Sequence, residues 1–498
     1  MITVRDLLAG VEVIESTVDL DAMVARVWHD SRQVTLGDAF VAIPGEKVHG
    51  DDYFAQARDR GAVLLVGTRK ETLLPHPAWV LVADARRTLA RLAHNAAGRP
   101  SDAATLVGIT GTNGKTSTTW LLEAIARSAG ANPGVVGTVN YRYAGRSEPA
   151  THTTPEAPVL QEILRTMVDA GCDTILMEVS SHALVMHRVL GCQWTVAAAT
   201  NLSPEHLDYH ETINEYGEAK ARLFTELLPA SRLARAAVLN IDDAWAASLK
   251  DRTSVEVLTV SLEDPGASVR VLESRVDADG IEASMDTPAG RLSIRSALGG
   301  RHNLSNIALA VGIACALDWP REAIEEGIRA CDRIPGRMDP VPNDLGIHVW
   351  VDYAHTPDAL ENAVRAARSM TEGELWVVFG AGGDRDRTKR PLMGAAVARG
   401  ADRSVVTSDN PRTEDPAVII DDILKGIPES DRARVLVEVD RATAIRRALA
   451  GARSGDGVLV AGKGHETYVE VHGVRTHFDD REIASAMLLE LAGGAHDA

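Results

Sequence analysis

The chain has 498 residues, which is too long for one hydrophobic core; a length of this order predicts about two to four domains, and we expect three. Apolar residues make up 45% and charged residues 24%, as in ordinary globular proteins, and no apolar run approaches the ~20 residues of a membrane-spanning helix. The 52 basic and 70 acidic side chains give a net charge of −18, which argues against nucleic-acid binding because a polyanion needs a basic face.

The N-terminal residues and the cysteines both favour a cytoplasmic protein. The first residues, MITVRDLLAGVEVIES, lack the basic, apolar and small-residue succession of a secretory signal. Cys172, Cys192, Cys315 and Cys331 lie far apart without a CxxC or Cys/His spacing, so neither a disulfide framework nor a structural zinc site is expected. We expect reduced thiols in the core.

The first hundred residues contain short apolar runs separated by polar stretches. These runs lie at residues 40–43, 63–66 and 80–82, and the pattern is typical of a small α/β unit. The stretch GRPS at 98–101 predicts a linker. We therefore place a first domain at residues 1–102.

Two longer series of apolar strands follow. The first alternates with amphipathic helices, which predicts a parallel sheet with helices on both faces. The Pro-Gly pair in RIPGR at 333–337 favours a boundary between the two series. We therefore place an α/β domain at 103–336 and another at 337–498. The strands are expected at residues 106–109, 174–177, 196–199 and 238–239, and then at 349–351, 375–379, 404–407 and 458–460.

A glycine-rich loop follows the first strand of the central domain. GITGTNGKTS at 108–117 lies between an apolar strand and a helix, which is the context of a phosphate-binding loop. Gly111 and Gly114 allow tight turns that aim backbone N–H groups inward, Lys115 can bridge two phosphates, and the Thr116 hydroxyl can ligate Mg²⁺. Ile109 replaces the first glycine of a strict GxxxxGK[ST] motif. The loop predicts an ATP-dependent enzyme.

Carboxylate and imidazole groups follow two further strands. Glu178 ends the apolar run 175–177, at the strand end where ligands gather in open parallel sheets, and is a candidate metal ligand. His206 belongs to the cluster EHLDYH at 205–210. Histidines near a carboxylate can bind a metal, but taken alone this cluster is explained more simply by a solvated loop.

Read together, these segments resemble the Mur ligases, which build the peptide stem of bacterial cell-wall precursors. HTTPE at 152–156 and the last four motifs below are similar to the tripeptide synthetases of that family, which add the third residue of the stem. The resemblance covers nearly the whole chain and rests on GTNGKT (111–116), MEVSSHAL (177–184), TNLSPEHLDYH (200–210), HNLSN (302–306), PGRMD (335–339), DYAHTPD (352–358), GAGGDRDRTKRPLM (380–393), DNPR (409–412) and GKGHE (462–466).

The resemblance implies the fold and the reaction. It implies an N-terminal domain that binds a UDP-sugar, a central ATPase with a P-loop-type parallel sheet and a C-terminal Rossmann-like domain that presents the incoming amino acid. ATP would phosphorylate the D-glutamyl carboxylate of UDP-MurNAc-L-Ala-D-Glu, and the amine of meso-diaminopimelate would displace the phosphate. The partners would be these small molecules, the cofactors ATP and Mg²⁺, and the protein a monomer with a mobile third domain.

The same resemblance assigns the ATP and metal sites. Lys115, Glu178, His206 and Lys220 would be catalytic, and the last three would hold magnesium together with Thr116. Lys220 matches a lysine that family members carry as a carbamate, although a lone lysine on a helix is by itself expected to be solvated. The ATP contacts would be Gly111, Thr112, Asn113, Gly114, Lys115, Thr116, Ser117, His302, Asn303, Arg337, Asp352 and His355.

The UDP-sugar site is assigned on resemblance alone, because Ser and Thr clusters are usually capping or loop residues. Met186 stands where relatives often have Gln, so we expect that contact to be lost. The residues that match the muramoyl-peptide site are Ser31, Arg32, His49, Gly50, Thr153, Thr154, Ser180, Met186 and Arg188.

The DNPR motif indicates which amino acid is added. Arg binds a carboxylate through a planar fork, and Asn can accept from an ammonium while it donates to an oxygen. In the family this motif accompanies meso-diaminopimelate, whereas lysine-adding relatives usually lack the Asn, the Arg or both. Lysine or another diamino acid such as ornithine remains the alternative. The implied contacts are Arg385, Asp409, Asn410, Pro411, Arg412, Gly462 and Glu466.

Two other functions stay open. A folylpolyglutamate-type ligase shares the phosphate loop and the lysine carbamate but lacks HTTPE and DNPR, and usually lacks the N-terminal domain. A P-loop regulatory protein without ligase chemistry would need neither the pair of His206 and Lys220 nor two further substrate-binding domains.

Overall fold

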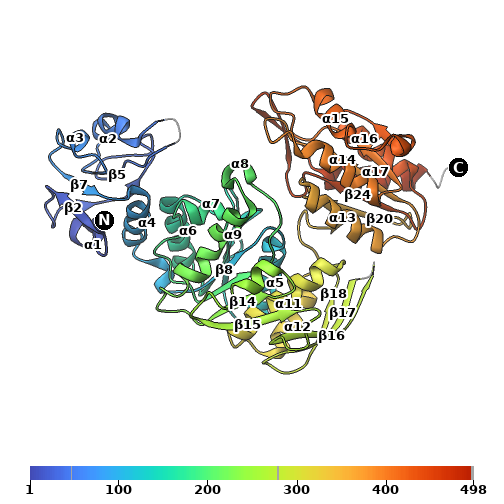
Figure 1. The fold of residues 1–498 in the computed structure, drawn as a ribbon, viewed down its shortest axis with the longest axis horizontal. Coiled ribbons are helices and arrows are strands. Elements are labelled where there is room, and N and C mark those ends of the chain that lie inside the picture. Colours follow the sequence, from blue (N-terminus) through green and yellow to red (C-terminus); the bar gives the residue numbers. More distant parts are fainter. Residues whose placement is uncertain (46–47, 278–279, 495–498) are drawn as a thin grey trace.

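Apart from residues 46–47, 278–279 and 495–498, the computed structural model describes the whole chain. Three lobes follow one another along the sequence, each built around its own main β-sheet, and the central lobe lies between the other two (Figure 1). This arrangement confirms the α/β fold class. None of the helices within the described residues combines the length and the apolar character needed to cross a membrane.

The N-terminal lobe, residues 2–96, has a sheet of strand order β2-β7-β6-β5-β4 in which β2 is antiparallel to β7 and the other pairs are parallel. The apolar runs of the sequence form the three inner strands, which are buried on both faces and are therefore continuously apolar. The strands are β1 (Ile2–Thr3), β2 (Val13–Ser16), β3 (Met23–Val24), β4 (Val27–Trp28), β5 (Ala39–Val41), β6 (Leu64–Gly67) and β7 (Trp79–Val82). The helices are α1 (Val4–Leu7), η1 (Gly50–Tyr53), α2 (Phe54–Asp59), α3 (Lys70–Leu73) and α4 (Ala85–Ala96), and η2 (Pro100–Asp102) leads to the central lobe.

The central lobe, residues 105–330, has a sheet of strand order β11-β10-β9-β12-β8-β13-β14-β15-β16-β17-β18. In this spatial order the seven central strands, β9-β12-β8-β13-β14-β15-β16, are parallel, as the sequence predicts. Antiparallel strands that the apolar pattern did not indicate, β10 and β11 at one edge and β17 and β18 at the other, extend the sheet. The strands are β8 (Thr105–Thr110), β9 (Pro133–Val136), β10 (Asn140–Tyr143), β11 (Arg146–Pro149), β12 (Thr174–Glu178), β13 (Val196–Ala199), β14 (Ala236–Asn240), β15 (Glu256–Ser261), β16 (Val269–Asp277), β17 (Gly280–Asp286) and β18 (Leu292–Ser296).

Two hydrophobic cores cover the two faces of this sheet, because successive residues of a strand point to opposite sides. Val107 belongs to one core with α5, α11 and α12, and its neighbour Leu106 belongs to the other with α6. The helices are α5 (Lys115–Ser128), α6 (Ala157–Asp169), α7 (Ser181–Val185), α8 (Leu207–His210), α9 (Ile213–Arg222), η3 (Leu223–Leu227), α10 (Ala244–Ser248), α11 (Arg301–Ala316) and α12 (Arg321–Ala330).

The C-terminal lobe, residues 339–494, has a sheet of strand order β19-β20-β24-β21-β22-β23, parallel except for β19. Its strands are β19 (Asp339–Pro340), β20 (His348–Asp352), β21 (Leu375–Phe379), β22 (Arg403–Val406), β23 (Val435–Val437) and β24 (Gly457–Ala461), and β25 (Tyr468–Val471) with β26 (Val474–His477) forms a hairpin. The helices are α13 (Pro357–Ser369), α14 (Lys389–Gly400), α15 (Pro416–Leu424), η4 (Glu429–Arg434), α16 (Arg441–Gly451) and α17 (Asp480–Gly494).

The parallel order of this sheet gathers four sequence motifs at one edge. The DYAHTPD, GAGGDRDRTKRPLM, DNPR and GKGHE segments begin at or just after the ends of β20, β21, β22 and β24. Because these strands are parallel and adjacent, their following loops meet at the carboxyl edge of the sheet, where open α/β sheets bind ligands.

Helix α12 packs tightly against α5, the helix that follows the phosphate loop. A Cβ atom at Gly327 of α12 would overlap Ile125 Cα of α5 and would lie 2.6 Å from Ile125 N. We expect Gly327→Ala to destabilise the protein by about 1–3 kcal/mol through overpacking, although alanine is ordinarily the better helix former. Thermal denaturation measures the effect.

The matched control is Gly493→Ala in α17, where no heavy atom of the described chain lies within 4 Å of the added Cβ. It should leave the melting temperature unchanged or slightly raised. A Gly327→Ala protein as stable as the control would contradict the tight packing of α12 on α5.

Candidate active site

A cavity of about 590 Å³ lies between the central and C-terminal lobes. The central lobe lines it with the phosphate loop, the end of β12 and the loop after β13, and the C-terminal lobe lines it with the DYAHTPD segment and α13. It combines most of the ATP and metal residues predicted from the sequence: Thr112, Asn113, Gly114, Lys115, Thr116, Ser117, Glu178, His206, Lys220, His302, Arg337, Asp352 and His355.

The phosphate loop is folded tightly against the loop after β13. Gly111 has φ 139° and Gly114 has φ 88°, values that favour glycine, and a Cβ at Gly111 would overlap Thr200 Oγ1. Asn201 accepts from two loop amides, Thr112 N on its carbonyl oxygen at 2.8 Å and Asn113 N on Oδ1 at 3.0 Å. The loop thus leads directly into α5, whose N-terminal N–H groups favour an anion.

Two lysines lie on the inner side of this loop. Lys115 Nζ donates to the carbonyl oxygens of Gly111 at 2.8 Å and Thr112 at 2.7 Å, and Lys220 Nζ donates to the same Gly111 oxygen at 2.8 Å. Burial lowers the pKa of Lys115, and burial followed by the charge of Lys115 lowers the pKa of Lys220 well below its ordinary value. Lys220 is 1% exposed, so the solvated lysine expected from sequence pattern alone is wrong.

Three oxygen-bearing side chains meet at the end of β12. Glu178, which is 1% exposed, accepts on Oε2 from Thr116 Oγ1 at 3.0 Å and from Thr138 Oγ1 at 2.7 Å, and on Oε1 from Thr138 N at 3.0 Å. Thr138 follows β9, the strand beside β12, and was not identified in the sequence. Its signal was weak, because a Gly-Thr after a short apolar run occurs in many loops.

This arrangement has the donor chemistry that Mg²⁺ requires. Hydroxyl and carboxylate oxygens are hard ligands, and Mg²⁺ in nucleotide sites takes one or two carboxylates together with phosphate and water. Within the described residues no group of three or more His, Cys, Asp and Glu side chains could hold a metal by itself. The residues therefore fit a magnesium ion that arrives with a nucleotide.

His206 and Glu205 stand opposite the phosphate loop. The His206 ring lies 4.8 Å from that of His182, and Glu205 Oε2 is 3.9 Å from His206 Nε2 and accepts from the Tyr216 hydroxyl at 3.3 Å. Burial would raise the pKa of Glu205, but Lys115 and the neighbouring histidines outweigh it and hold that pKa below its ordinary value. Glu205 is thus a half-buried anion in the same cavity as the two lysines, a role that the sequence did not indicate.

The C-terminal lobe closes the cavity with its own side chains. Arg337 Nη2 donates to Thr116 Oγ1 at 3.4 Å, and its guanidinium lies 4.8 Å from the ring centre of Tyr353. His355 Nδ1 is 2.7 Å from the carbonyl oxygen of Tyr353, and burial lowers the pKa of its imidazole. The Asp352 carboxylate accepts from Met338 N at 2.7 Å. It therefore fixes the backbone where the chain enters the C-terminal lobe and does not point freely into the cavity.

The HNLSN segment of α11 presents a partly different set of residues from the predicted one. His302 lines the cavity together with Ser305 and Asn306. Asn303 is 1% exposed; it donates to the Gly299 carbonyl oxygen at 2.9 Å and accepts from Asn306 Nδ2 at 3.2 Å. Residues three apart on a helix are neighbours on the same face. Asn303 therefore lies next to Asn306 but on the side away from the cavity, and Asn306 is the one that lines it.

Residues assigned to the UDP-sugar site fall into two groups. Thr154 Oγ1 donates to the Glu178 carbonyl oxygen at 2.8 Å and accepts from Ser180 N at 3.0 Å, and Arg188 Nη1 donates to the Thr154 carbonyl oxygen at 3.0 Å. Thr153 is bonded to Thr138 at 3.1 Å. These residues therefore adjoin the cavity.

The other group lies in the N-terminal lobe. Ser31 Oγ donates to Gln56 Oε1 at 2.5 Å, and Arg32 folds back on Asp30 with two bonds of 2.9 Å. His49 caps η1, and at Gly50 a Cβ would lie 2.6 Å from Ile43 N. The cavity lining contains none of these four predicted residues. In the central lobe, Met186 Sδ lies 3.2 Å from Arg188 Nη2, where it packs on the guanidinium.

The DNPR and GKGHE segments lie together at the edge of the C-terminal sheet. Asn410 Nδ2 donates to Glu466 Oε2 at 2.9 Å, and Arg412 Nη1 donates to the Gly383 carbonyl oxygen at 2.7 Å. A Cβ at Gly462 would lie 2.5 Å from Asp409 Oδ2, so glycine is required there. A Cβ at Gly383 would overlap the Pro411 carbonyl oxygen, and a Cβ at Gly382 would lie 4.0 Å from Arg385 Cγ.

Arg390 and Glu414 fix this loop pair and were not identified in the sequence. Arg390 is fully buried and forms two bonds to Glu414, at 2.8 and 3.1 Å. Glu414 also accepts from Asp384 N at 2.6 Å, and the hydrogen bond from Arg390 lowers the pKa of Glu414 to about 2. The carboxylate therefore ties the loop after β21 to the loop after β22.

Tyr353 connects this edge to the cavity. Tyr353 lines the cavity, and its ring centre is 4.8 Å from that of His465, the residue before Glu466. Tyr353 therefore borders both the cavity and the GKGHE segment, whereas the cavity lining within the described part of the chain includes no residue of DNPR or GKGHE itself.

Asp358 accepts two hydrogen bonds across the cavity from the central lobe. Its Oδ2 accepts from Asn113 Nδ2 of the phosphate loop at 3.1 Å and from Ser203 Oγ at 2.8 Å. We expect Asp358→Ala to loosen this contact, and small-angle X-ray scattering of the free protein should give a larger radius of gyration.

Asp344→Ala, at an exposed position of the same lobe, is the matched control and should scatter like the wild type. Identical curves for Asp358→Ala and the wild type would show that these two bonds do not hold the lobes together in solution.

Three family models match the chain: the Mur ligase family catalytic domain over residues 24–97, the Mur ligase middle domain over 109–314 and the Mur ligase glutamate ligase domain over 336–464. The chain is 44% identical over 504 residues to the UDP-N-acetylmuramoyl-L-alanyl-D-glutamate--2,6-diaminopimelate ligase of Geobacter metallireducens, and the match covers 98% of each protein.

Solved structures agree with this result. A structure of a ligase with the same name is 31% identical and matches with a TM-score of 0.72 over 99% of both chains. The MurF ligase from Thermotoga maritima, solved in complex with ADP, is 18% identical and has a TM-score of 0.61 over 95% of this chain and 97% of that one. This second likeness establishes a common fold.

Proposed function

Because the chain belongs to the Mur ligase family, we propose that it is the ADP-forming ligase that joins meso-2,6-diaminopimelate to UDP-MurNAc-L-Ala-D-Glu in peptidoglycan precursor synthesis. The observation that carries this proposal is the position of Tyr353, which lines the phosphate-loop cavity and packs against His465, the residue before Glu466 of the Asn410–Glu466 pair. A ligase must bring an activated carboxylate and an amine together, and this neighbourhood of the two places favours such a reaction.

In this proposal the phosphate loop binds ATP and its residues assist phosphoryl transfer. The N–H groups at the start of α5 would receive the phosphates, and Lys115 would exchange its loop carbonyls for phosphate oxygens. Mg²⁺, held by Thr116 and Glu178, would neutralise phosphate charge when bound. Arg337, already 3.4 Å from Thr116, would add a second cation from the C-terminal lobe.

The acceptor carboxylate would lie beside the metal site, on the side of Glu178 away from the phosphate loop. Thr153 and Ser180 line the cavity near Glu178, and Arg188 adjoins them, so these side chains could hold the D-glutamyl end of the muramoyl dipeptide. We propose that the N-terminal domain (1–102) binds the UDP moiety, the central domain (103–336) ATP and the C-terminal domain (337–498) the diamino acid. The protein would act as a cytoplasmic monomer.

Lys220 would carry a carbamate in the working enzyme. Its amine can react with CO₂ to give a carbamate and a proton, and the uncharged amine favoured by burial is the reactive form. The product would be an anion beside Lys115 in the cavity that His206 also lines, so it would replace the repulsion between two basic groups by an attraction and provide an oxygen ligand.

The diamino acid would bind at the edge formed by DNPR and GKGHE. Arg412 offers a planar fork for a carboxylate, and Glu466 offers an acceptor for an ammonium group. Lysine lacks the second carboxylate that Arg412 would bind, so this site favours diaminopimelate. Arg385 and Asp409 complete the charged lining.

One assay tests the reaction. Purified protein is given ATP, Mg²⁺ and UDP-MurNAc-L-Ala-D-Glu, with meso-diaminopimelate or lysine added in turn, and ADP release is followed. We expect ADP release only with the muramoyl dipeptide, diaminopimelate and Mg²⁺ together. ADP release that does not need the dipeptide would refute the ligase, whereas activity with lysine alone would refute only the choice of amino acid.

A second experiment tests the carbamate. We expect Lys220→Ala to lower kcat at least about a hundredfold, because it removes a charge at the reacting phosphates. Wild-type enzyme depleted of CO₂ should lose activity and recover it when bicarbonate is added. Lys250→Ala, at an exposed lysine of the same lobe, should behave as wild type, and activity indifferent to bicarbonate would contradict the carbamate.

A further inference from the structure

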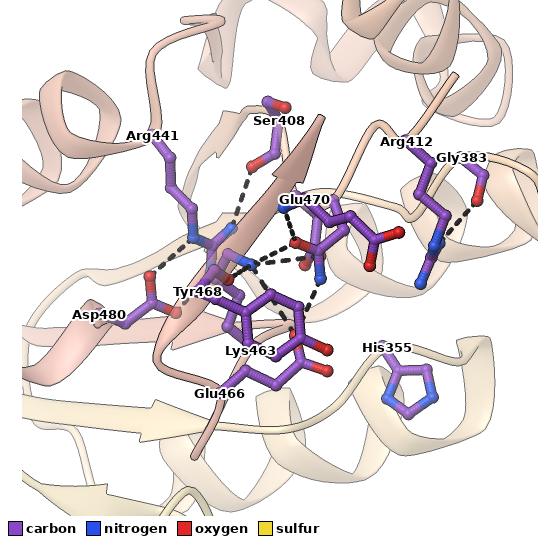
Figure 2. A network of polar contacts seen from close by, with 12 residues as sticks. His355, Gly383, Ser408, Arg412, Arg441, Lys463, Glu466, Tyr468, Glu470 and Asp480 are labelled. Atoms are coloured by element: carbon purple, nitrogen blue, oxygen red, sulfur yellow. Dashed lines mark hydrogen bonds and ion pairs between the residues drawn. The ribbon is translucent and has the colours of Figure 1, made fainter. Parts of the chain in front are cut away.

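Lys463, the second residue of GKGHE, is a fully buried lysine at the base of the DNPR edge (Figure 2). Its Nζ donates to Asn410 Oδ1 at 2.9 Å and to the Tyr468 carbonyl oxygen at 2.7 Å. The same nitrogen is 3.8 Å from Glu466 Oε2 and 3.9 Å from Asp409 Oδ1. One ammonium group therefore touches the amide and stands close to both carboxylates of this edge.

Lys463 determines which way the Asn410 amide points. A side-chain amide can present either its oxygen or its nitrogen, and its neighbours decide. The oxygen of Asn410 receives two groups that can only donate, Lys463 Nζ at 2.9 Å and Glu470 N at 2.9 Å. The nitrogen therefore faces Glu466 Oε2, at 2.9 Å. Asn410 thus acts as a donor here, and its oxygen is not available to the ammonium of a ligand.

Lys463 also balances the charge of this edge. Asp409 and Glu466 are two carboxylates in one partly buried place, and two such groups repel each other. Arg441 pairs with Asp480 through two bonds of 2.7 Å, and Arg412 donates to the Gly383 carbonyl oxygen. Lys463 Nζ lies 3.9 Å from Asp409 Oδ1 and 3.8 Å from Glu466 Oε2, so its charge offsets the repulsion of these two carboxylates.

We propose that Lys463 is a positioning residue for recognition of the diamino acid: it holds Asn410 as a donor to Glu466, places a positive charge beside the Glu466 carboxylate and keeps that carboxylate aimed at the ammonium group of the ligand. This inference rests on the proposed function, since it concerns the same substrate site. Lys463 itself is covered by Asn410 and Tyr468 and does not reach the ligand.

Lys463→Met is the main test, because methionine fills similar space without charge or donor. In steady-state assays we expect the KM for meso-diaminopimelate to rise roughly tenfold to hundredfold, the loss typical of a buried charged hydrogen bond. The KM values for ATP and for UDP-MurNAc-L-Ala-D-Glu should stay at their wild-type levels. Lys250→Met, at an exposed position of the central lobe, is the control for the same chemical change.

Lys463→Gln separates the two roles. Glutamine can still donate to Asn410 but has no charge, so its KM for diaminopimelate should lie between those of the wild type and Lys463→Met. In an Asn410→Ala background, Lys463→Met should raise that KM by a smaller factor than it does in the wild type, because one of its two targets is gone. If Lys463→Met does not fold, the glutamine and alanine variants carry the test.

Three results would overturn the inference: a Lys463→Met enzyme with wild-type KM for diaminopimelate, equal rises in all three KM values, or the same factor in the presence and absence of Asn410. Failure of the proposed function is distinguishable, because then the wild-type enzyme itself would not respond to diaminopimelate.

Discussion

Two lysines, Lys220 buried and Lys115 half-buried, share one acceptor in this protein, and much of the site follows from that constraint. Lys115 and Lys220 both donate to the carbonyl oxygen of Gly111, each at 2.8 Å. Burial and the neighbouring basic group therefore disfavour a positive charge on both side chains at once unless anions lie nearby. Glu205 supplies one anion. The remaining positive potential is what a nucleotide phosphate would meet.

The shared carbonyl depends in turn on a backbone detail. Gly111 has a positive φ and lies so close to Thr200 that a side chain would not fit, and this turns its carbonyl toward both lysines. Strand β8 pairs with β12 on one side and β13 on the other, so the loops after all three strands meet at one edge. Glu178 and the loop from 200 to 206 reach the phosphate loop for this reason.

In the C-terminal lobe, too, the loops after adjacent parallel strands meet at one edge of the sheet, here at the proposed site of the amino acid. Its parallel strands bring DNPR and GKGHE together, and buried groups behind them, Lys463 and Arg390, fix how the exposed groups point. Specificity for an amino acid therefore depends on more than the letters of the DNPR motif. Tyr353 packs between this edge and the cavity, and Asp358 bonds to the phosphate loop across the cavity.

The sequence by itself determined the elements that depend on local patterns. The apolar runs at 63–66, 174–177 and 458–460 became strands because burial on both faces needs continuous apolar residues. The phosphate loop was equally predictable, since a turn with positive φ needs glycine at 111 and 114 whatever surrounds it. The order of the motifs along the chain then indicated the family, and the family indicated which residues to expect in the site.

Tertiary structure alone decided which distant side chains meet. Thr138 is 40 residues from Glu178, and Asp358 is 245 residues from Asn113, and no local pattern relates such pairs. Burial was decided in the same way: Lys220 and Lys463 look like solvated lysines in the sequence, and only the packing of other elements removes them from water. A hydrogen bond or a charge is strong there because water is excluded, and exclusion of water is a property of the whole fold.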